Sequence, residues 1–360
     1  MEGIAKRVLA VFIITALIIT AIKSNAFNSF FDTAKDAAVF SALLAMPEGY
    51  YQNIRKMAGA TVSADDTIYN PEPENIPEDD ILQSEPETST APLPEEAVGR
   101  IISRFVSPYS VKLAYNNVYV RNLTSKEIDL KSELEAGPAL RLNSTNEPQV
   151  LIIHTHTTEG FMLEDRDYYT NLDESRTTDM TKNIVHIGEI IKNQIEAAGI
   201  SVIHDVTLHD YPSYSGSYSR SEKTVRQYLE KYPSIKVVLD IHRDAISAGG
   251  TDKVKPVKEI NGKKAAQIML VLGCEDGNVT GFPNWRENLR LGLKVQQLCE
   301  VKYPGLARAI HFAPKKYNQH LSTGSMIIEV GTDANTLEEA IYSGQLIGKV
   351  LGSVLNTLKQ

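Results

Sequence analysis

At 360 residues and a formal net charge of −8, the chain is long enough for one large folded domain with additional segments. Its negative charge is concentrated in residues 57–99, which hold eleven Asp or Glu and no Lys or Arg. Removing these eleven charges from −8 leaves +3 for the rest, which argues against a nucleic-acid-binding protein and is compatible with an anionic wall polymer as partner. Two cysteines are too few for a disulfide framework.

Residues 1–26 have the pattern of an N-terminal transmembrane anchor. The basic pair Lys6-Arg7 precedes an apolar run at 8–22, which gives a positive flank on the cytoplasmic side. Fifteen residues are few for a span, which usually needs about 20, and Ser24-Asn25-Ala26 resembles a signal-peptide cleavage site. An uncleaved anchor and a signal peptide both fit, and both export the rest of the chain. We expect the anchor, because another apolar stretch and a long tether follow it.

The segment between the anchor and the folded part is expected to be a tether. A juxtamembrane segment at 27–56 leads into a linker at 57–96, which is acidic and rich in proline. Such a composition cannot bury enough apolar surface to offset its ordering entropy, so the linker is predicted to be disordered. A small accessory segment follows at 97–147, with the pattern of a short helix at 97–106 and of a strand at 111–119.

From residue 148 to residue 360, short apolar runs alternate with amphipathic helical patterns. This alternation predicts a three-layer α/β domain with a central, mostly parallel sheet flanked by helices. The expected strands are 150–154, 201–204, 236–241, 266–273, 309–312 and 325–330. The expected helices are 177–198, 220–231, 285–303 and 336–358.

Three of these strands end in side chains that bind metals or transfer protons. The first leads into His154-Thr155-His156-Thr157-Thr158-Glu159, the third into Asp240-Ile241-His242-Arg243-Asp244, and the last contains Glu329. Enzymes of the α/β class place their sites at the carboxyl ends of strands. We therefore expect the three segments to be neighbours in space.

These residue types indicate a zinc hydrolase. Catalytic zinc usually takes three protein ligands and leaves a fourth position for water. His156, Glu159 and His242 form such a set, and His154 is the alternative imidazole. The ion lowers the pKa of its water toward about 7, and a carboxylate must then pass the water's proton to the leaving nitrogen. Glu329, in an otherwise apolar strand, is the expected catalytic residue.

Four further residues are candidates for supporting the site. Asp240 points to the same face of its strand as His242, so it either caps the sheet or hydrogen-bonds the imidazole of His242 from behind. Arg243 and Asp244 either pair with each other or hold a substrate carboxylate and a ligand. Asn318, on the loop that leads to the last strand, is expected to contact the substrate.

The chain resembles the stage II sporulation protein P family of endospore-forming bacteria. The resemblance rests on residues 153–159, 232–244, 317–319 and 328–331 in this order, and it covers about residues 148–358. It implies a single-pass cell-membrane protein that carries a zinc-dependent N-acetylmuramoyl-L-alanine amidase domain on the extracytoplasmic side. Its implied substrates are the stem peptides and glycan of peptidoglycan, with an additional endopeptidase activity.

The same resemblance implies a place and partners for this activity. The amidase would act at the forespore septum or mother-cell membrane during engulfment, with Zn2+ as cofactor and stage II sporulation proteins D and M as partners. The wider cell-wall amidases place their first His ligand after a Gly and their acidic ligand at the start of the next helix. Here no Gly precedes His154 or His156, and that helix start offers Asp179. The choices between these two histidines, and between Glu159 and Asp179, stay open.

Two other functions fit the same residues. A non-catalytic, membrane-anchored scaffold would use the groove to hold peptidoglycan. A zinc carboxypeptidase is indicated by the His-x-x-Glu spacing alone. Zinc content and product analysis distinguish these alternatives from the amidase.

Overall fold

The computed structural model describes residues 92–143 and 146–360. The predicted anchor, the juxtamembrane segment and the linker up to residue 91 lie outside the described residues. Among the helices of the described residues, none has the length and apolar character needed to cross a membrane. Cys274 and Cys299 are both free and buried.

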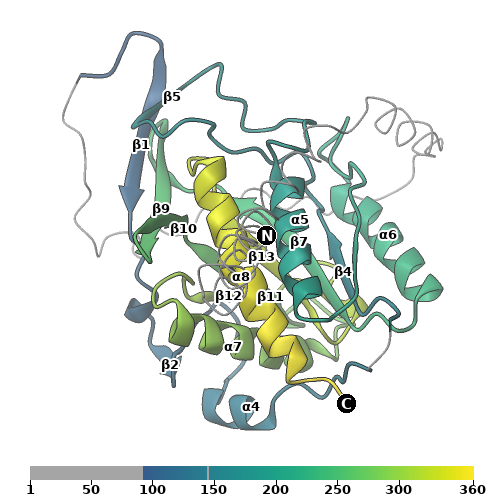
Figure 1. The fold of residues 1–360 in the computed structure, drawn as a ribbon. Helices are drawn as coiled ribbons and strands as arrows, with labels where there is room; N and C mark the ends of the chain where they lie inside the picture. The colour runs from purple at the N-terminus through teal and green to yellow at the C-terminus, as the bar shows by residue number, and fades with distance from the viewer. Residues whose placement is uncertain (1–91, 144–145) are drawn as a thin grey trace, which may run out of the picture. The chain divides into compact units, whose positions relative to one another are not determined.

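An eight-stranded sheet forms the centre of the described domain (Figure 1). In order across the sheet, its strands are β2 (Leu113–Tyr115), β3 (Val118–Asn122), β12 (Ile310–Ala313), β11 (Ile268–Gly273), β13 (Ser325–Thr332), β7 (Val237–Asp244), β4 (Val150–Ile153) and β6 (Val202–His204). Neighbouring strands are parallel except in the pairs β2–β3 and β11–β13. The expected mostly parallel sheet is confirmed, and it contains every strand that the sequence predicted.

Helices cover both faces of this sheet (Figure 1). They are α5 (Ile184–Ala197), α6 (Ser217–Lys231), α7 (Trp285–Lys302) and α8 (Leu337–Asn356). Ile152 of β4 belongs to the core formed with α5, α7 and α8, whereas Leu151 and Ile153 pack with Val225 of α6. Since successive side chains of a strand point to opposite faces, β4 is buried on both sides, which explains its unbroken apolar run.

A second sheet lies next to the carboxyl end of β13. Its strands are β1 (Ala97–Arg104), β5 (Tyr168–Thr170), β8 (Ser247–Gly249), β9 (Asp252–Ile260) and β10 (Lys263–Ala266). Thr332 Oγ1 at the end of β13 donates to Val254 O of β9 at 2.8 Å. The predicted helix at 97–106 is wrong. Pairing of β1 with β9 on one edge and β5 on the other overrides the local helical pattern.

Turns shift several other predicted boundaries. Asn116-Asn117, both in the left-handed region, divide the predicted strand 111–119 into the hairpin β2–β3. Helix α5 begins at Ile184 instead of Thr177, because the side chain of Asn183 caps it by accepting a hydrogen bond from Val185 N at 3.0 Å. The remaining short helices are α4 (Leu130–Ala136), η2 (Pro108–Ser110) and η3 (Gln319–Leu321).

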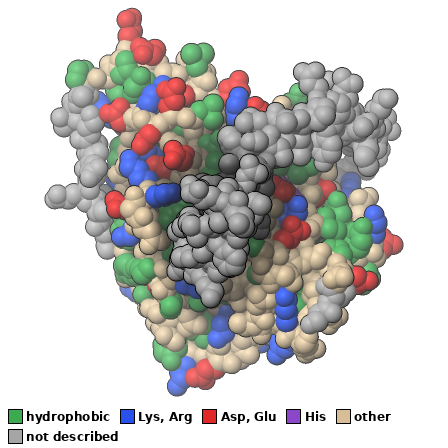
Figure 2. All heavy atoms as spheres, viewed as in Figure 1, with side chains coloured by type: hydrophobic (Ala, Val, Ile, Leu, Met, Phe, Trp, Pro, Cys, Tyr) green, Lys and Arg blue, Asp and Glu red, His purple; other side chains and the backbone are tan. Residues whose placement is uncertain are grey.

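Charged side chains of both signs are distributed over the surface. On the face shown in Figure 2, Lys and Arg are interspersed with Asp and Glu among the described residues. This mixture agrees with the small net charge calculated for the chain outside its acidic linker.

Candidate functional site

The site lies where the carboxyl ends of β4, β7 and β13 meet. The three strands are adjacent and parallel in the sheet. Ile153 pairs with Asp240, and Glu329 pairs with His242 in the ladder. The segments that the sequence predicted to be neighbours are therefore brought together by the sheet.

Glu159 and His242 form the centre of this group. Both are buried, and Glu159 Oε2 lies 3.7 Å from His242 Nδ1. On the opposite edge of the imidazole, Nε2 lies 2.8 Å from Asp240 Oδ1. Burial alone would lower the pKa of His242, but the negative charges of Asp240, Glu159 and Glu329 raise it to about 10. In the ion-free protein His242 is thus protonated at neutral pH.

Asp240 is itself held in place by Thr155. The backbone N–H of Thr155 donates to Asp240 Oδ1 at 2.8 Å, and its hydroxyl donates to Oδ2 at 2.6 Å. These bonds fix the carboxylate behind the imidazole of His242. This is the position from which a carboxylate orients a metal-binding histidine.

Arg243 fixes the loop that carries Glu159. Its backbone N–H donates to Glu159 Oε2 at 3.0 Å, and its buried guanidinium donates to Gly160 O at 2.8 Å. Asp244 forms an ion pair with Arg308 at 2.9 Å. Of the two alternatives for Arg243 and Asp244, an ion pair between their side chains is not found among the described residues, since each has another partner.

His156 approaches the same centre from the end of β4. Its ring centroid is 5.2 Å from that of His242, with the two rings nearly perpendicular at 87°. Its Nε2 lies 3.1 Å from the hydroxyl of Tyr214, and its Nδ1 lies 3.3 Å from Ser217 Oγ. Burial, followed by the charge of His242, lowers the pKa of His156 to about 2. The imidazole of His156 is therefore neutral, the state that a metal ligand requires.

His154 is engaged elsewhere. It is fully buried, with Nδ1 2.8 Å from Ile241 O and Nε2 2.8 Å from His204 Nε2. A side chain at Gly188 would meet this ring, because a Cβ there would lie 2.6 Å from His154 Nε2. The structure thus brings His156, and not the nitrogens of His154, toward Glu159 and His242.

Glu329 lies beside His242 with one oxygen unsatisfied. Its Oε2 is buried and has no hydrogen-bond partner among the described residues. Burial raises the pKa of Glu329 to about 8 against the opposing charge of His242, with the negative charge of Asp244 adding to the rise. The residue as a whole is half-buried. A buried carboxyl oxygen without a partner is costly for stability, and carboxyl groups with a raised pKa are typical of functional sites.

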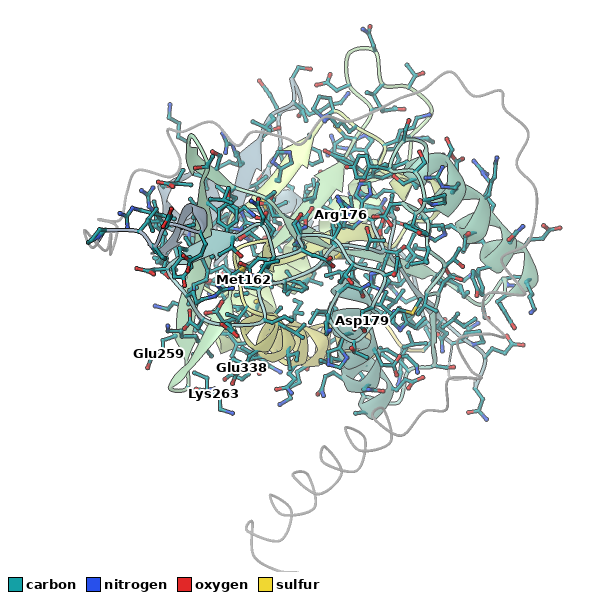
Figure 3. The ribbon with its side chains drawn as sticks, turned by 90° about the horizontal axis from the view of Figure 1, so that it is seen from above. Met162, Arg176, Asp179, Glu259, Lys263 and Glu338 are labelled. Atoms are coloured by element: carbon teal, nitrogen blue, oxygen red, sulfur yellow. The ribbon has the colours of Figure 1, made fainter. Side chains whose placement is uncertain are left out.

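Asp179 lies apart from this centre. Its Oδ1 accepts hydrogen bonds from Thr181, and its half-exposed carboxylate pairs with Lys182 at 3.2 Å. Figure 3 shows Asp179 beside α5 and apart from Arg176. Arg176 Nη2, in contrast, lies 3.7 Å from Glu159 Oε1. Of the two acidic candidates, the structure places Glu159 next to His242.

Two side chains that were not among the predicted site residues contact this centre from loops. Arg176 Nη1 forms an ion pair with Asp210 Oδ2 at 2.7 Å, and its guanidinium carbon lies 4.7 Å from the ring centroid of Tyr214. Nothing in the sequence around Arg176 signals this role. The run of tyrosines and serines around Tyr214 is the kind of pattern that could have indicated it.

Asn318 connects the loop before β13 to α6. Its Nδ2 donates to Tyr218 O at 2.9 Å and to Ser221 Oγ at 3.1 Å. These bonds hold the left-handed backbone of Asn318, whose φ is 57°. The expected substrate contact of Asn318 stays a prediction.

The donors of this group suit zinc, although they are not closed around one point. As the side chains stand, no three His, Cys, Asp or Glu within 92–143 and 146–360 are grouped so that they could hold a metal. The 3.7 Å between Glu159 Oε2 and His242 Nδ1 is close to the separation of two donors that share one ion at about 2.0–2.1 Å each. The third donor, His156, is turned to Tyr214.

A comparison with known families assigns the chain. The sequence profile of the family described as Stage II sporulation protein P matches residues 57–352. This chain belongs to the stage II sporulation protein P family. A curated relative, stage II sporulation protein P of Bacillus subtilis (strain 168), is 28% identical over 207 residues. That match covers 53% of this chain and 47% of the relative, so it spans about half the relative's length.

Solved structures similar to this member of the stage II sporulation protein P family include three cell-wall amidases. The CwlD amidase from Clostridioides difficile in complex with the GerS lipoprotein has a TM-score of 0.35 and 13% identity, covering 58% of this chain and 99% of that chain. Ami1 from Mycobacterium abscessus has a TM-score of 0.34 and 11% identity, covering 59% and 99%. An amidase from Clostridium difficile 630 has a TM-score of 0.33 and 14% identity, covering 59% and 97%. TM-scores of this size do not establish a common fold, and the family assignment rests on the sequence profile.

Proposed function

We propose that this chain is a zinc-dependent peptidoglycan hydrolase of sporulation, an N-acetylmuramoyl-L-alanine amidase. The observation that supports the proposal most is the carboxyl of Glu329 beside the Glu159–His242 pair, since its Oε2 is buried without a hydrogen-bond partner among the described residues. A proton-accepting carboxyl next to a mixed imidazole and carboxylate donor set is what amide hydrolysis at zinc requires. Membership of the stage II sporulation protein P family supports the biological setting.

Each residue has a defined part in this proposal. His156, Glu159 and His242 would hold the ion, which when bound supplies a water of lowered pKa and polarises the scissile carbonyl. Glu329 would accept a proton and pass it to the leaving nitrogen once the charge of the bound ion lowers its pKa from the value of about 8. Asp240, whose Oδ1 lies 2.8 Å from His242 Nε2, would hold the imidazole of His242 in one orientation through its charge.

The remaining parts of the proposal concern cellular context. We infer a single-pass membrane protein from the apolar pattern of residues 8–22, with the hydrolase on the extracytoplasmic side. An additional endopeptidase activity, a role in engulfment, and stage II sporulation proteins D and M as partners are proposed from the family resemblance alone.

The decisive test uses the purified full-length chain and purified peptidoglycan. We expect release of stem peptides with a new amino-terminal L-alanine, because the amidase cuts the bond between the lactyl group and that residue. A chelator should abolish release, and added zinc should restore it. Release of only carboxyl-terminal amino acids would indicate the carboxypeptidase. Peptidoglycan binding with no release and no zinc in the protein would favour the scaffold.

The zinc affinity is expected to rise at least about tenfold per pH unit between about pH 6 and 8. His242 has a pKa of about 10 in the ion-free protein, so it carries a proton in this range and must release it to bind the ion. His156, with a pKa of about 2, releases none. Protons therefore compete with zinc, and the affinity increases as the pH rises. Competition titrations against a chelator, corrected for its own protonation, measure this slope, and an affinity independent of pH would contradict it.

A further inference from the structure

Strand β13 contains one extra residue shortly after Glu329. Glu329 pairs with His242 of β7, but the next pair in the ladder is Thr332 with Asp244, so three residues of β13 stand opposite two of β7. A β-bulge of this kind bends the strand and fixes its register, and bulges are frequent beside active sites. The bulge therefore helps to set where Glu329 lies along β7.

Gly331 provides the backbone conformation of this bulge. Its φ is 64°, in the left-handed region that residues with a side chain rarely adopt. A Cβ at this position would lie 2.7 Å from Asn335 Oδ1 and 2.8 Å from Ala266 Cβ, which is closer than such atoms approach in proteins. Because Gly331 has no side chain, the amide of Asn335 can lie directly against the bulge.

The side chain of Asn335 connects the bulge to its surroundings. It is fully buried, and its Oδ1 accepts a hydrogen bond from Thr332 N at 2.9 Å. Its Nδ2 donates to Pro256 O of β9 at 3.2 Å and to Glu339 Oε2 of α8 at 2.9 Å. One buried amide thus links the end of β13 with the second sheet and the last helix. Without it, the buried N–H of Thr332 would lose its acceptor, which is costly.

Glu329 depends on the backbone of β13 for its position. No described residue donates a hydrogen bond to its Oε2. The strand, and not a contact at this oxygen, therefore sets where that side of the carboxyl lies. The precision matters, since a displacement of about 1 Å in a reacting group can cost about 10²-fold in rate.

We propose that Asn335 is a positioning residue for Glu329. By accepting the hydrogen bond from Thr332 N, its amide keeps the bulge in one conformation and thereby holds the Glu329 carboxyl beside the Glu159–His242 pair. Asn335 takes no part in the chemistry itself, because both ends of its amide are engaged within the protein. This inference rests on the proposed function of Glu329 as the proton acceptor.

Asn335→Ala should lower the turnover number about 10²-fold, while KM and zinc affinity stay near their wild-type values. The matched control is Asn288→Ala at the other end of β13. Asn288 is also fully buried, and its Oδ1 accepts a hydrogen bond from Ser325 N at 2.9 Å. Ser325 lies about 13 Å along the strand from Glu329. Asn288→Ala should therefore lose stability as Asn335→Ala does, but keep the wild-type turnover.

The test measures stem-peptide release and thermal unfolding of the full-length wild type and both variants. Lower turnover in Asn335→Ala alone, at a similar loss of stability in both variants, supports the positioning role. The same turnover in both variants overturns it, because a purely structural asparagine would act through stability alone. If Asn335→Ala does not fold, Asn335→Asp and Asn288→Asp replace the alanine pair with the same two outcomes, since the aspartate cannot donate to Pro256 O or Glu339.

Crystal structures of the ion-free protein give an independent readout. In Asn335→Ala the Glu329 carboxyl should lie about 1 Å or more from its wild-type position relative to His242. In Asn288→Ala it should not move. An unmoved carboxyl in Asn335→Ala overturns the positioning role, whatever the rates are. If the wild type releases no stem peptides, the proposed function fails, and this comparison still decides whether Asn335 positions Glu329.

Discussion

Glu329→Gln is expected to lower the turnover number about 10²- to 10⁴-fold while zinc content stays at the wild-type level. The amide has nearly the size of the carboxyl, so the packing between β11, β13 and β7 is retained. It has no basic oxygen for the proton of the attacking water. Rates of peptide release from labelled peptidoglycan give the turnover number, and metal analysis of the same preparations gives the zinc content.

Glu329→Gln is expected to change the chemistry of this side chain without disturbing its contacts. Glu329 Oε2 accepts no hydrogen bond from the described residues, so the amide breaks no existing contact at that oxygen. Glu338→Gln, at an exposed position near the start of α8, is the matched control and should retain full activity (Figure 3). Wild-type turnover in Glu329→Gln would exclude Glu329 as the proton acceptor. Loss of zinc together with activity would instead make Glu329 a ligand.

Much of the fold could be predicted from the sequence because the buried strands have a strong local pattern. β4 is covered by α6 on one face and by α5 on the other, so its residues at 150–153 are all apolar. The predictions that were wrong concern segments whose structure depends on pairing with strands far away in the sequence. Ala97–Arg104 forms a strand because β9 and β5 lie on its two edges. The hairpin β9–β10 was overlooked, although Asn261-Gly262 is a turn signal.

The site was only partly predictable because the chain leaves the strand just before the histidines. Within a strand, His154 and His156 would point to the same face. β4 ends at Ile153, and the turn that follows sends His154 to His204 and His156 to His242. No periodicity describes such a turn. Arg176 and Tyr214 reach the site from loops, where position depends on tertiary contacts.

Glu159 lies on a loop that contacts the start of α5 through the backbone. Glu159 O accepts a hydrogen bond from Ile184 N, the first residue of α5, at 2.8 Å. Gly160 N donates to Ser175 O at 2.9 Å, and the guanidinium of Arg243 donates to Gly160 O at 2.8 Å. The loop therefore docks onto the amino-terminal end of α5.

Glu159→Gln is expected to weaken zinc binding more than about 100-fold, because even the loss of a partner behind a ligand costs about 10- to 100-fold. The amide oxygen can still accept the hydrogen bond from Arg243 N, so the loop should keep its position. Asp179→Asn is the matched control and should change the affinity little, since that carboxylate is engaged with Thr181 and Lys182. The measurement is the same chelator competition, with circular dichroism to compare the folds. The reverse result would be loss of zinc binding in Asp179→Asn and its retention in Glu159→Gln. That result would make Asp179 the acidic ligand, and the loop at 176–182 would have to refold around the ion.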